Sequence, residues 1–211
     1  MAKAWVIGAT WLACLLLVTG CAGNAPVEPS PTPTPAPTTT SEATAAPTMT
    51  APPFPTQAPP AVDDRASDFR FTLFQGEDVL GASEMALSEL EGRPLVLNFW
   101  ARFCTPCWSE MPELQDFYEE YDDRVRLLGI DVGQFTGLGS HKDAGKLLDS
   151  LGITYPAGYT DDGRVVRYYQ IRAMPTTAFI TAEGVVFRLW TGSITREEVT
   201  TIVRMMLEEE Q

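Results

Sequence analysis

The most informative part of this sequence is the segment Leu95-Val96-Leu97-Asn98-Phe99-Trp100-Ala101-Arg102-Phe103-Cys104-Thr105-Pro106-Cys107. Its first six residues are nearly all apolar, which is typical of a central strand buried on both faces of a sheet. The two cysteines lie where this strand passes into a helix, which we expect to run from about Thr105 to Tyr121. The segment therefore predicts an α/β domain with two cysteines at the beginning of a helix.

The spacing of these cysteines indicates thiol–disulfide exchange. A helix N-terminus offers unpaired amides and a positive dipole end, which favour a thiolate, so we expect Cys104 to be the nucleophile. Cys107 lies one turn further on and is expected to resolve a mixed disulfide. One alternative is half of a zinc site, for which the domain offers only His141 and carboxylates as further ligands. Another is a structural disulfide, although so short a loop hardly constrains the unfolded chain. The exchange reaction requires no cofactor and no metal.

Further elements are predicted on both sides of this segment. We expect an N-terminal hairpin in which Gln75-Gly76 forms the turn, and a late antiparallel hairpin joined by Ala182-Glu183-Gly184. Thr195 and Glu198 form a capping-box pattern that begins the last helix. In chain order, the expected strands are 69–74, 78–80, 95–100, 125–131, 177–181 and 185–191, and the expected helices are 88–90, 105–121, 143–151, 162–169 and the C-terminal one.

Composition excludes two classes of protein. The chain has 211 residues, with 28 acidic and 15 basic side chains and a formal net charge of −13. Nucleic-acid binding depends on clustered Lys and Arg, and no basic run is present, so we predict no nucleic-acid partner. The single histidine, His141, also excludes a His-rich metal enzyme.

The N-terminal third has the composition of an export signal followed by a linker. Residues 1–20 combine Lys3 with a short apolar run, which predicts a secretory signal peptide rather than a membrane span. The end of that run, Leu17-Val18-Thr19-Gly20-Cys21, resembles the bacterial lipobox, so Cys21 is the expected acylated residue. The alternatives are an ordinary signal peptide and an uncleaved anchor. Residues 21–62 are rich in Pro and Thr and predict a disordered, extended linker. Residues 63–211 have the usual size of one domain.

Three separated motifs carry a resemblance to a known family. They are the segment ending in Cys104-Thr105-Pro106-Cys107, then Glu110-Met111-Pro112, and finally Met174-Pro175-Thr176-Thr177. Over roughly residues 66–211, the sequence resembles the thioredoxin-like thiol-disulfide oxidoreductases of the TlpA and ResA type, which belong to the redoxin, or AhpC-TSA, superfamily. The resemblance implies a thioredoxin-like α/β fold with a central mixed sheet flanked by helices. It also implies an N-terminal β-hairpin and a central αβ insertion at about residues 132–170.

The same resemblance assigns roles around the cysteines. It implies that Pro175 is in the cis form and faces the disulfide, with the Met174 backbone placed to pair with substrate. Glu110 matches an acidic residue that tunes the thiol pKa or shuttles a proton, the alternative being a solvated carboxylate on the helix surface. Asn98 replaces the buried aspartate of thioredoxin itself. The residues expected to contact substrate are Trp100, Phe103, Thr105, Pro106, Met174, Pro175 and Thr176.

The resemblance implies a reductase that lies outside the cytoplasm and is anchored to the periplasmic or outer face of the cell membrane. Its expected substrates are disulfides of exported proteins, such as apocytochrome c during cytochrome c maturation. Its expected electron donor is a membrane thiol carrier of the CcdA or DsbD type, its membrane contact is the lipid anchor, and it is expected to be a monomer. One alternative is an antioxidant thiol peroxidase of the peroxiredoxin type, although Ala101 stands where a peroxidatic cysteine usually has a threonine. The other is a redox-inactive surface adaptor.

Overall fold

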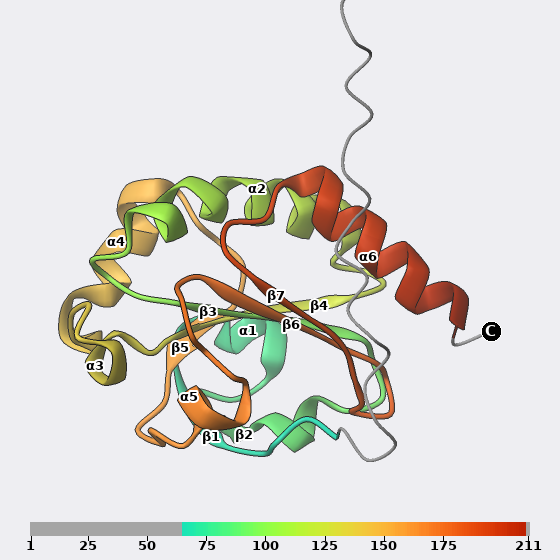
Figure 1. Cartoon of the computed structure of the whole chain (residues 1–211), viewed down its shortest axis with the longest axis horizontal. Helices are drawn as coiled ribbons and strands as arrows, with labels where there is room; N and C mark the ends of the chain where they lie inside the picture. Colours follow the sequence, from blue (N-terminus) through green and yellow to red (C-terminus); the bar gives the residue numbers. More distant parts are fainter. Residues whose placement is uncertain (1–64, 210–211) are drawn as a thin grey trace, which may run out of the picture. The chain divides into compact units, whose positions relative to one another are not determined.

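The computed structural model describes residues 65–209, which build a seven-stranded mixed sheet between two layers of helices (Figure 1). The strand order is β2-β1-β5-β4-β3-β6-β7. The central strands β3, β4 and β5 are parallel, whereas β1, β6 and β7 each run antiparallel to their neighbours. The strands are β1 (Arg70–Gln75), β2 (Glu84–Ala86), β3 (Leu95–Trp100), β4 (Arg126–Asp131), β5 (Ala157–Tyr159), β6 (Thr176–Ile180) and β7 (Val186–Thr191).

Strand β3 is buried along its whole length, as its apolar sequence predicts. Successive side chains of a strand point to opposite faces of the sheet. Val96 and Trp100 accordingly belong to the core on one face, and Leu97 and Phe99 to the core on the other. Asn98 shares the face of Val96 and Trp100, so this strand carries a polar side chain into an otherwise apolar layer.

The two helical layers are unequal. Figure 1 shows α2 (Thr105–Tyr121), α4 (Ala144–Leu151) and α6 (Arg196–Glu209) together on one side of the sheet. The shorter segments η1 (Leu87–Leu90) and α5 (Val165–Tyr168) cover the other side. The long helix α2 thus lies directly over the face that carries Asn98.

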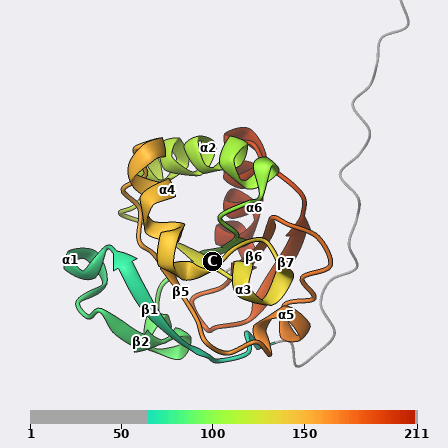
Figure 2. The same cartoon turned by 90° about the vertical axis from the view of Figure 1, so that its left-hand side faces the viewer.

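The N-terminal hairpin is confirmed, but one of its expected strands is wrong. Strand β1 pairs with β2, where Phe71 opposes Met85. The segment expected as a strand, Asp78–Leu80, lies instead in a single helical turn, α1 (Glu77–Leu80). This turn stands between Gly76 (φ 94°) and Gly81 (φ 92°), whose left-handed conformations reverse the chain on either side. Figure 2 shows α1, β1 and β2 at the sheet edge away from β6 and β7.

The central insertion contains a strand that the sequence pattern did not reveal. It consists of α3 (Gly133–Thr136), η2 (His141–Asp143), α4, β5 and α5. Strand β5 is only three residues long and contains Gly158, which hides its strand character. A Cβ on Gly158 would lie 2.2 Å from the carbonyl oxygen of Thr72, so the close approach of β1 to β5 requires glycine here.

The C-terminal elements agree with the sequence. Strands β6 and β7 form the expected antiparallel hairpin. The backbone N–H of Thr195 donates to Glu198 Oε2 over 2.8 Å, and the Glu198 N–H donates to Thr195 Oγ1 over 3.3 Å. This reciprocal pair is a capping box, and α6 begins at the next residue, Arg196.

The predicted signal peptide (residues 1–20), the linker (21–62) and the acylated Cys21 all lie outside the described residues. Within residues 65–209, no helix combines the length and the hydropathy that a membrane span requires.

Candidate active site

The two cysteines form a disulfide at the beginning of α2. Their Cα atoms are 5.3 Å apart. Cys104 is the N-cap residue of α2, and its Sγ accepts a hydrogen bond from the Cys107 N–H over 3.2 Å. Cys104 is 4% exposed and Cys107 is fully buried, so an incoming sulfur can approach only Cys104. In the reduced protein, the same amide and the helix dipole would stabilise a Cys104 thiolate.

A groove of about 450 Å³ opens beside Cys104. One wall is the segment that contains the Met174–Pro175 peptide bond, which is cis, as the family resemblance implied. The other wall belongs to the central insertion, whose Leu138 carbonyl accepts the Phe103 N–H over 2.8 Å. The lining residues are Phe103, Cys104, Thr105, Pro106, Thr136, Leu138, Ile171, Arg172, Ala173 and Met174.

Glu110 lies behind the disulfide, inside the protein. It is 1% exposed, so the alternative of a solvated surface carboxylate is wrong. Its Oε1 accepts a hydrogen bond from Asn98 Nδ2 over 2.7 Å, and its Oε2 accepts one from the Ile194 N–H over 3.1 Å. Asn98 Nδ2 also donates to Thr177 Oγ1 over 3.0 Å. The carboxyl group, which α2 carries, is therefore held by donors from β3 and from the loop before α6.

Burial raises the pKa of Glu110 to about 8, although the hydrogen bonds from Asn98 and Ile194 act in the opposite direction. Desolvation disfavours the charged carboxylate, and two donors do not fully replace the lost water. A pKa of about 8 is close to that of an ordinary thiol, at about 8.5. Glu110 therefore ionises in the pH range in which an ordinary thiol also does.

One short segment connects the parts of this site. We call residues 192–196, between β7 and α6, the bridging segment. The Gly192 N–H donates to the Pro175 carbonyl over 2.9 Å, and Ser193 Oγ donates to the Pro106 carbonyl over 3.2 Å. Together with the bond from Ile194 to Glu110, these contacts tie the cis-proline segment to the first turns of α2. The sequence identified Thr195 in this segment as a helix cap, but gave no sign of the contacts with Pro106, Glu110 and Pro175.

The predicted substrate contacts divide into two groups. Phe103 (63% exposed), Thr105, Pro106 and Met174 line the groove. Trp100 is fully buried and Thr176 is 1% exposed, so the expectation that these two contact substrate is wrong for this arrangement. Trp100 packs beneath the cysteines. Thr176 Oγ1 donates to the Ala173 carbonyl over 2.8 Å and so supports the groove wall from inside. Pro175 is buried as well and does not line the groove, so its side chain, like those of Trp100 and Thr176, lies away from a substrate in the groove.

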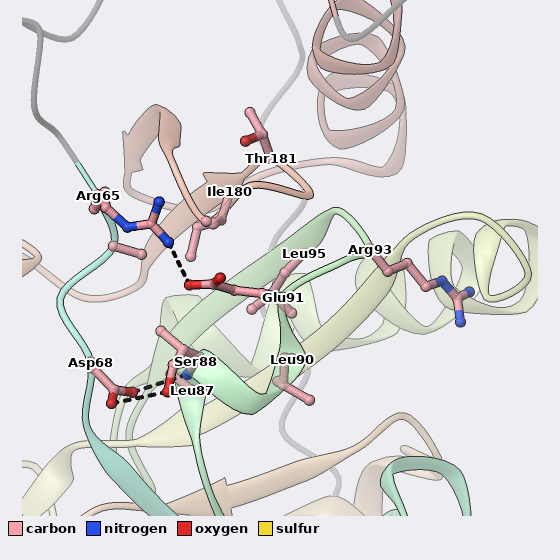
Figure 3. A pocket seen from close by; sticks show the side chains of 12 residues that line it. Arg65, Asp68, Leu87, Ser88, Leu90, Glu91, Arg93, Leu95, Ile180 and Thr181 are labelled. Carbon is pink, nitrogen blue, oxygen red and sulfur yellow. Dashed lines mark hydrogen bonds and ion pairs between the residues drawn. The ribbon is translucent and has the colours of Figure 1, made fainter.

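A second hollow, of about 210 Å³, lies far from the cysteines (Figure 3). Leu95 and Ile180 line it, which places it where β3 begins and β6 ends, at the opposite end of the strands from Cys104. An ion pair between Arg65 and Glu91 (2.7 Å) spans part of its rim. Residues 65–209 contain no group of three His, Cys, Asp or Glu side chains placed to ligate a metal. The cysteine pair, with the groove beside Cys104 and the buried Glu110 behind it, is therefore the candidate active site.

Comparison with known proteins agrees with this geometry. The model of the AhpC/TSA family matches residues 62–188. The chain is 34% identical, over 138 residues, to the thiol-disulfide oxidoreductase ResA of Oceanobacillus iheyensis, an alignment that covers 65% of this chain and 69% of that protein.

Two solved structures share the fold. StoA from Bacillus subtilis superposes with a TM-score of 0.54 at 19% identity, covering 66% of this chain and 98% of that one. The exposed lipoprotein thioredoxin Etrx1 from Streptococcus pneumoniae superposes with a TM-score of 0.55 at 22% identity, covering 66% of this chain and 99% of that one. A disulfide at a helix N-terminus beside a cis-proline, on a sheet shared with these proteins, places the chain in the AhpC/TSA family as a ResA-like thiol-disulfide oxidoreductase.

Proposed function

We propose that this thiol-disulfide oxidoreductase works as a reductase of disulfides in exported proteins, among which apocytochrome c is the leading candidate. The observation that carries the proposal is the Cys104–Cys107 disulfide at the base of an open groove, with the buried Glu110 behind it. A redox-inactive adaptor would need neither the groove beside Cys104 nor a carboxyl group with a thiol-like pKa.

The reaction proceeds in two exchange steps. The Cys104 thiolate attacks one sulfur of the substrate disulfide, which forms a mixed disulfide and releases the other substrate sulfur as a thiolate that takes up a proton. Cys107 then loses its proton and attacks Cys104 Sγ, which closes the Cys104–Cys107 disulfide and releases the second substrate thiol. Two electrons pass from the enzyme to the substrate; one proton comes from Cys107, and the other comes from water, which received it when Cys104 ionised.

Glu110 acts in this scheme as the proton carrier for Cys107. The two residues lie three positions apart on the inner face of α2, and both are buried. A group that exchanges protons works best when its pKa lies near that of its partner and near the operating pH. The Asn98 and Ile194 hydrogen bonds fix the orientation of the carboxyl group during the exchange.

The N-terminal sequence and the relatives support a proposal for the electron donor and for the location of the enzyme. The enzyme is recharged by a membrane thiol donor of the CcdA or DsbD type, which reduces Cys104–Cys107 by the reverse of the same two steps. It acts as a monomer outside the cytoplasm, attached through an acyl group on Cys21 and a linker of residues 21–62, ahead of a domain of residues 63–211. The likeness to a lipoprotein thioredoxin supports this placement.

Trapping experiments test the cysteine roles. A full-length Cys107→Ser variant should accumulate mixed disulfides through Cys104, because the resolving thiol is missing. Cys104→Ser should accumulate none. Equal trapping by both variants would contradict the assignment.

The direction of electron flow is tested by the reduction potential of the pair, measured by thiol alkylation in dithiothreitol buffers. A value near that of thioredoxin, roughly −270 mV, or lower, is expected for a reductase. A value near that of DsbA, roughly −120 mV, would instead make the protein an oxidant.

The anchor is tested by cell fractionation. Cys21→Ser should move the protein out of the membrane fraction, whereas Cys14→Ser, a matched change within the signal region, should leave it there. Retention of the Cys21→Ser protein in the membrane would refute acylation at this residue.

A further inference from the structure

The groove beside Cys104 differs in charge from the rest of the protein. The chain has a formal net charge of −13. None of the groove-lining residues carries a carboxylate, and their one charged side chain is the cation Arg172. The surface where a substrate must lie next to the disulfide therefore has the opposite sign to the whole molecule.

Arg172 is exposed and has no carboxylate partner among residues 65–209. Four arginines of this part of the chain form ion pairs, namely Arg65 with Glu91, Arg124 with Asp123, Arg164 with Asp162, and Arg196 with Glu120, and Arg172 is not among them. An unpaired guanidinium at the rim of a reactive groove is available to an incoming ligand, and its planar donors match a carboxylate.

A second cation, Arg102, lies against one of the lining residues. The guanidinium of Arg102 lies 5.5 Å from the centre of the Phe103 ring, and Phe103 is itself a lining residue with 63% of its surface exposed. The groove thus combines an apolar lining, formed by Leu138, Ile171 and the Phe103 ring, with a single charged lining residue, the cation Arg172.

We propose that this groove selects substrate segments that carry an acidic residue close to the target cysteine, and that Arg172 is the specificity-determining residue that reads this charge. The proposal rests on the proposed function, because it concerns the substrate of the same exchange reaction. An extended segment would place an apolar side chain on the apolar lining and its cysteine sulfur at Cys104. A carboxylate near that cysteine would then reach Arg172.

The preference is modest in size and sensitive to salt. Arg172 is exposed, and an ion pair at an exposed site contributes little because water and ions screen it. The same charge also speeds the encounter with an acidic segment, whereas the rest of this acidic protein repels it. We therefore expect a two- to fivefold difference in rate at low ionic strength, decreasing toward none in high salt.

The test uses three disulfide-bonded peptides that differ only in one residue near the cysteine, which is Glu, Gln or Lys. The reduced full-length Cys107→Ser protein reacts with each peptide, and the rate of mixed-disulfide formation is measured. We expect the rate to be highest with the Glu peptide, lower with the Gln peptide and lowest with the Lys peptide. Arg172→Gln should remove the difference between Glu and Gln, and Arg172→Glu should reverse it.

Arg167→Gln is the matched control, because Arg167 is an exposed arginine on α5 that does not line the groove. It should keep the preference of the unmodified chain. Equal rates with all three peptides, or a preference that survives in Arg172→Gln, would overturn the proposal and leave the reductase function intact. Failure of every peptide to form a mixed disulfide would instead reject the proposed function, and the specificity with it.

Discussion

Glu110 shows how one residue depends on contacts from distant parts of the chain. Its position in α2 places it one turn after Cys107, but its pKa depends first on burial and then on hydrogen bonds from Asn98 on β3 and from Ile194 before α6. Burial raises the pKa, and the two donors limit the rise. Because its pKa is about 8, this carboxyl group gains or loses its proton in the same pH range as thiols do.

We predict that the rate of disulfide exchange carries the titration of Glu110. The resolution step should become faster as the pH rises through about 8 in the unmodified protein, because Glu110 can accept the Cys107 proton only when it is ionised. Glu110→Gln should lose this dependence and slow the step at pH 7 by about tenfold to a hundredfold, because a positioned acid–base group is missing. Stopped-flow tryptophan fluorescence across pH 5–10 measures both effects.

Asp116→Asn is the control for this prediction, since Asp116 is exposed on the same helix. It should behave like the unmodified protein. An unchanged pH profile in Glu110→Gln would show that Glu110 takes no part in proton transfer.

Among the elements, the pairing of β1 with β5 depends on a single glycine. Gly158 opposes Leu73 in the register of the two strands, and a Cβ there would overlap the Thr72 carbonyl. The two strands lie where the N-terminal hairpin meets the parallel centre of the sheet, so a local separation would loosen the attachment of the whole hairpin.

Gly158→Ala is therefore expected to lower the free energy of unfolding by roughly 3 kcal/mol, because neither backbone can move away without breaking the ladder. Urea unfolding followed by circular dichroism provides the measurement. Gly145→Ala is the control within α4, where a new Cβ would meet Phe74 at an ordinary 3.7 Å. It should stabilise the protein by about 0.5–1 kcal/mol, as removal of a helical glycine does. Similar effects of the two changes would contradict the predicted overlap.

The predictability of the elements follows from how strong their local signals are. The buried strand β3, the helix after Cys104 and the capping box at Thr195 are set by contiguous patterns, and all were predicted. Strand β5 and the turn α1 are short and are shaped by glycines, so tertiary pairing decides them. The burial of Glu110 was left open, although Cys107, Leu114 and Tyr121 share its helix face. No local sequence pattern identifies Leu138 and Arg172 as groove residues, because they come to line the same groove as Cys104 only in the folded chain.

At the scale of the whole molecule, the raised pKa of Glu110 makes stability depend on pH. The group ionises near its ordinary value of 4.5 in the unfolded chain and at about 8 in the folded one. Between these values, the folded protein keeps a proton that the unfolded chain has lost, so a rise in pH favours unfolding. The stability due to this proton is complete below pH 4.5 and is lost as the pH rises to 8.

We predict that the free energy of unfolding of the oxidised protein falls between pH 5 and 8 by up to about 1.4 kcal/mol per pH unit from this group. Burial also raises the pKa of Asp131, which adds to the slope with the same sign. The difference between the unmodified chain and Glu110→Gln isolates Glu110, and urea titrations at several pH values provide it. Parallel pH curves for the two proteins would show that the carboxyl group is ionised in the folded state.

The contacts of the bridging segment also mean that the active site can assemble only after nearly the whole chain has been synthesised. Those with Pro106 and Glu110 span 87 and 84 positions, and Asn98 meets Thr177 across 79. A nascent chain that has just exposed its two cysteines therefore lacks the groove wall, the cis-proline segment and the environment of Glu110. Its thiols react as ordinary cysteines do until residues 192–196 have emerged and docked. A chain whose synthesis stopped before Gly192 would contain both cysteines but could not assemble the oxidoreductase active site.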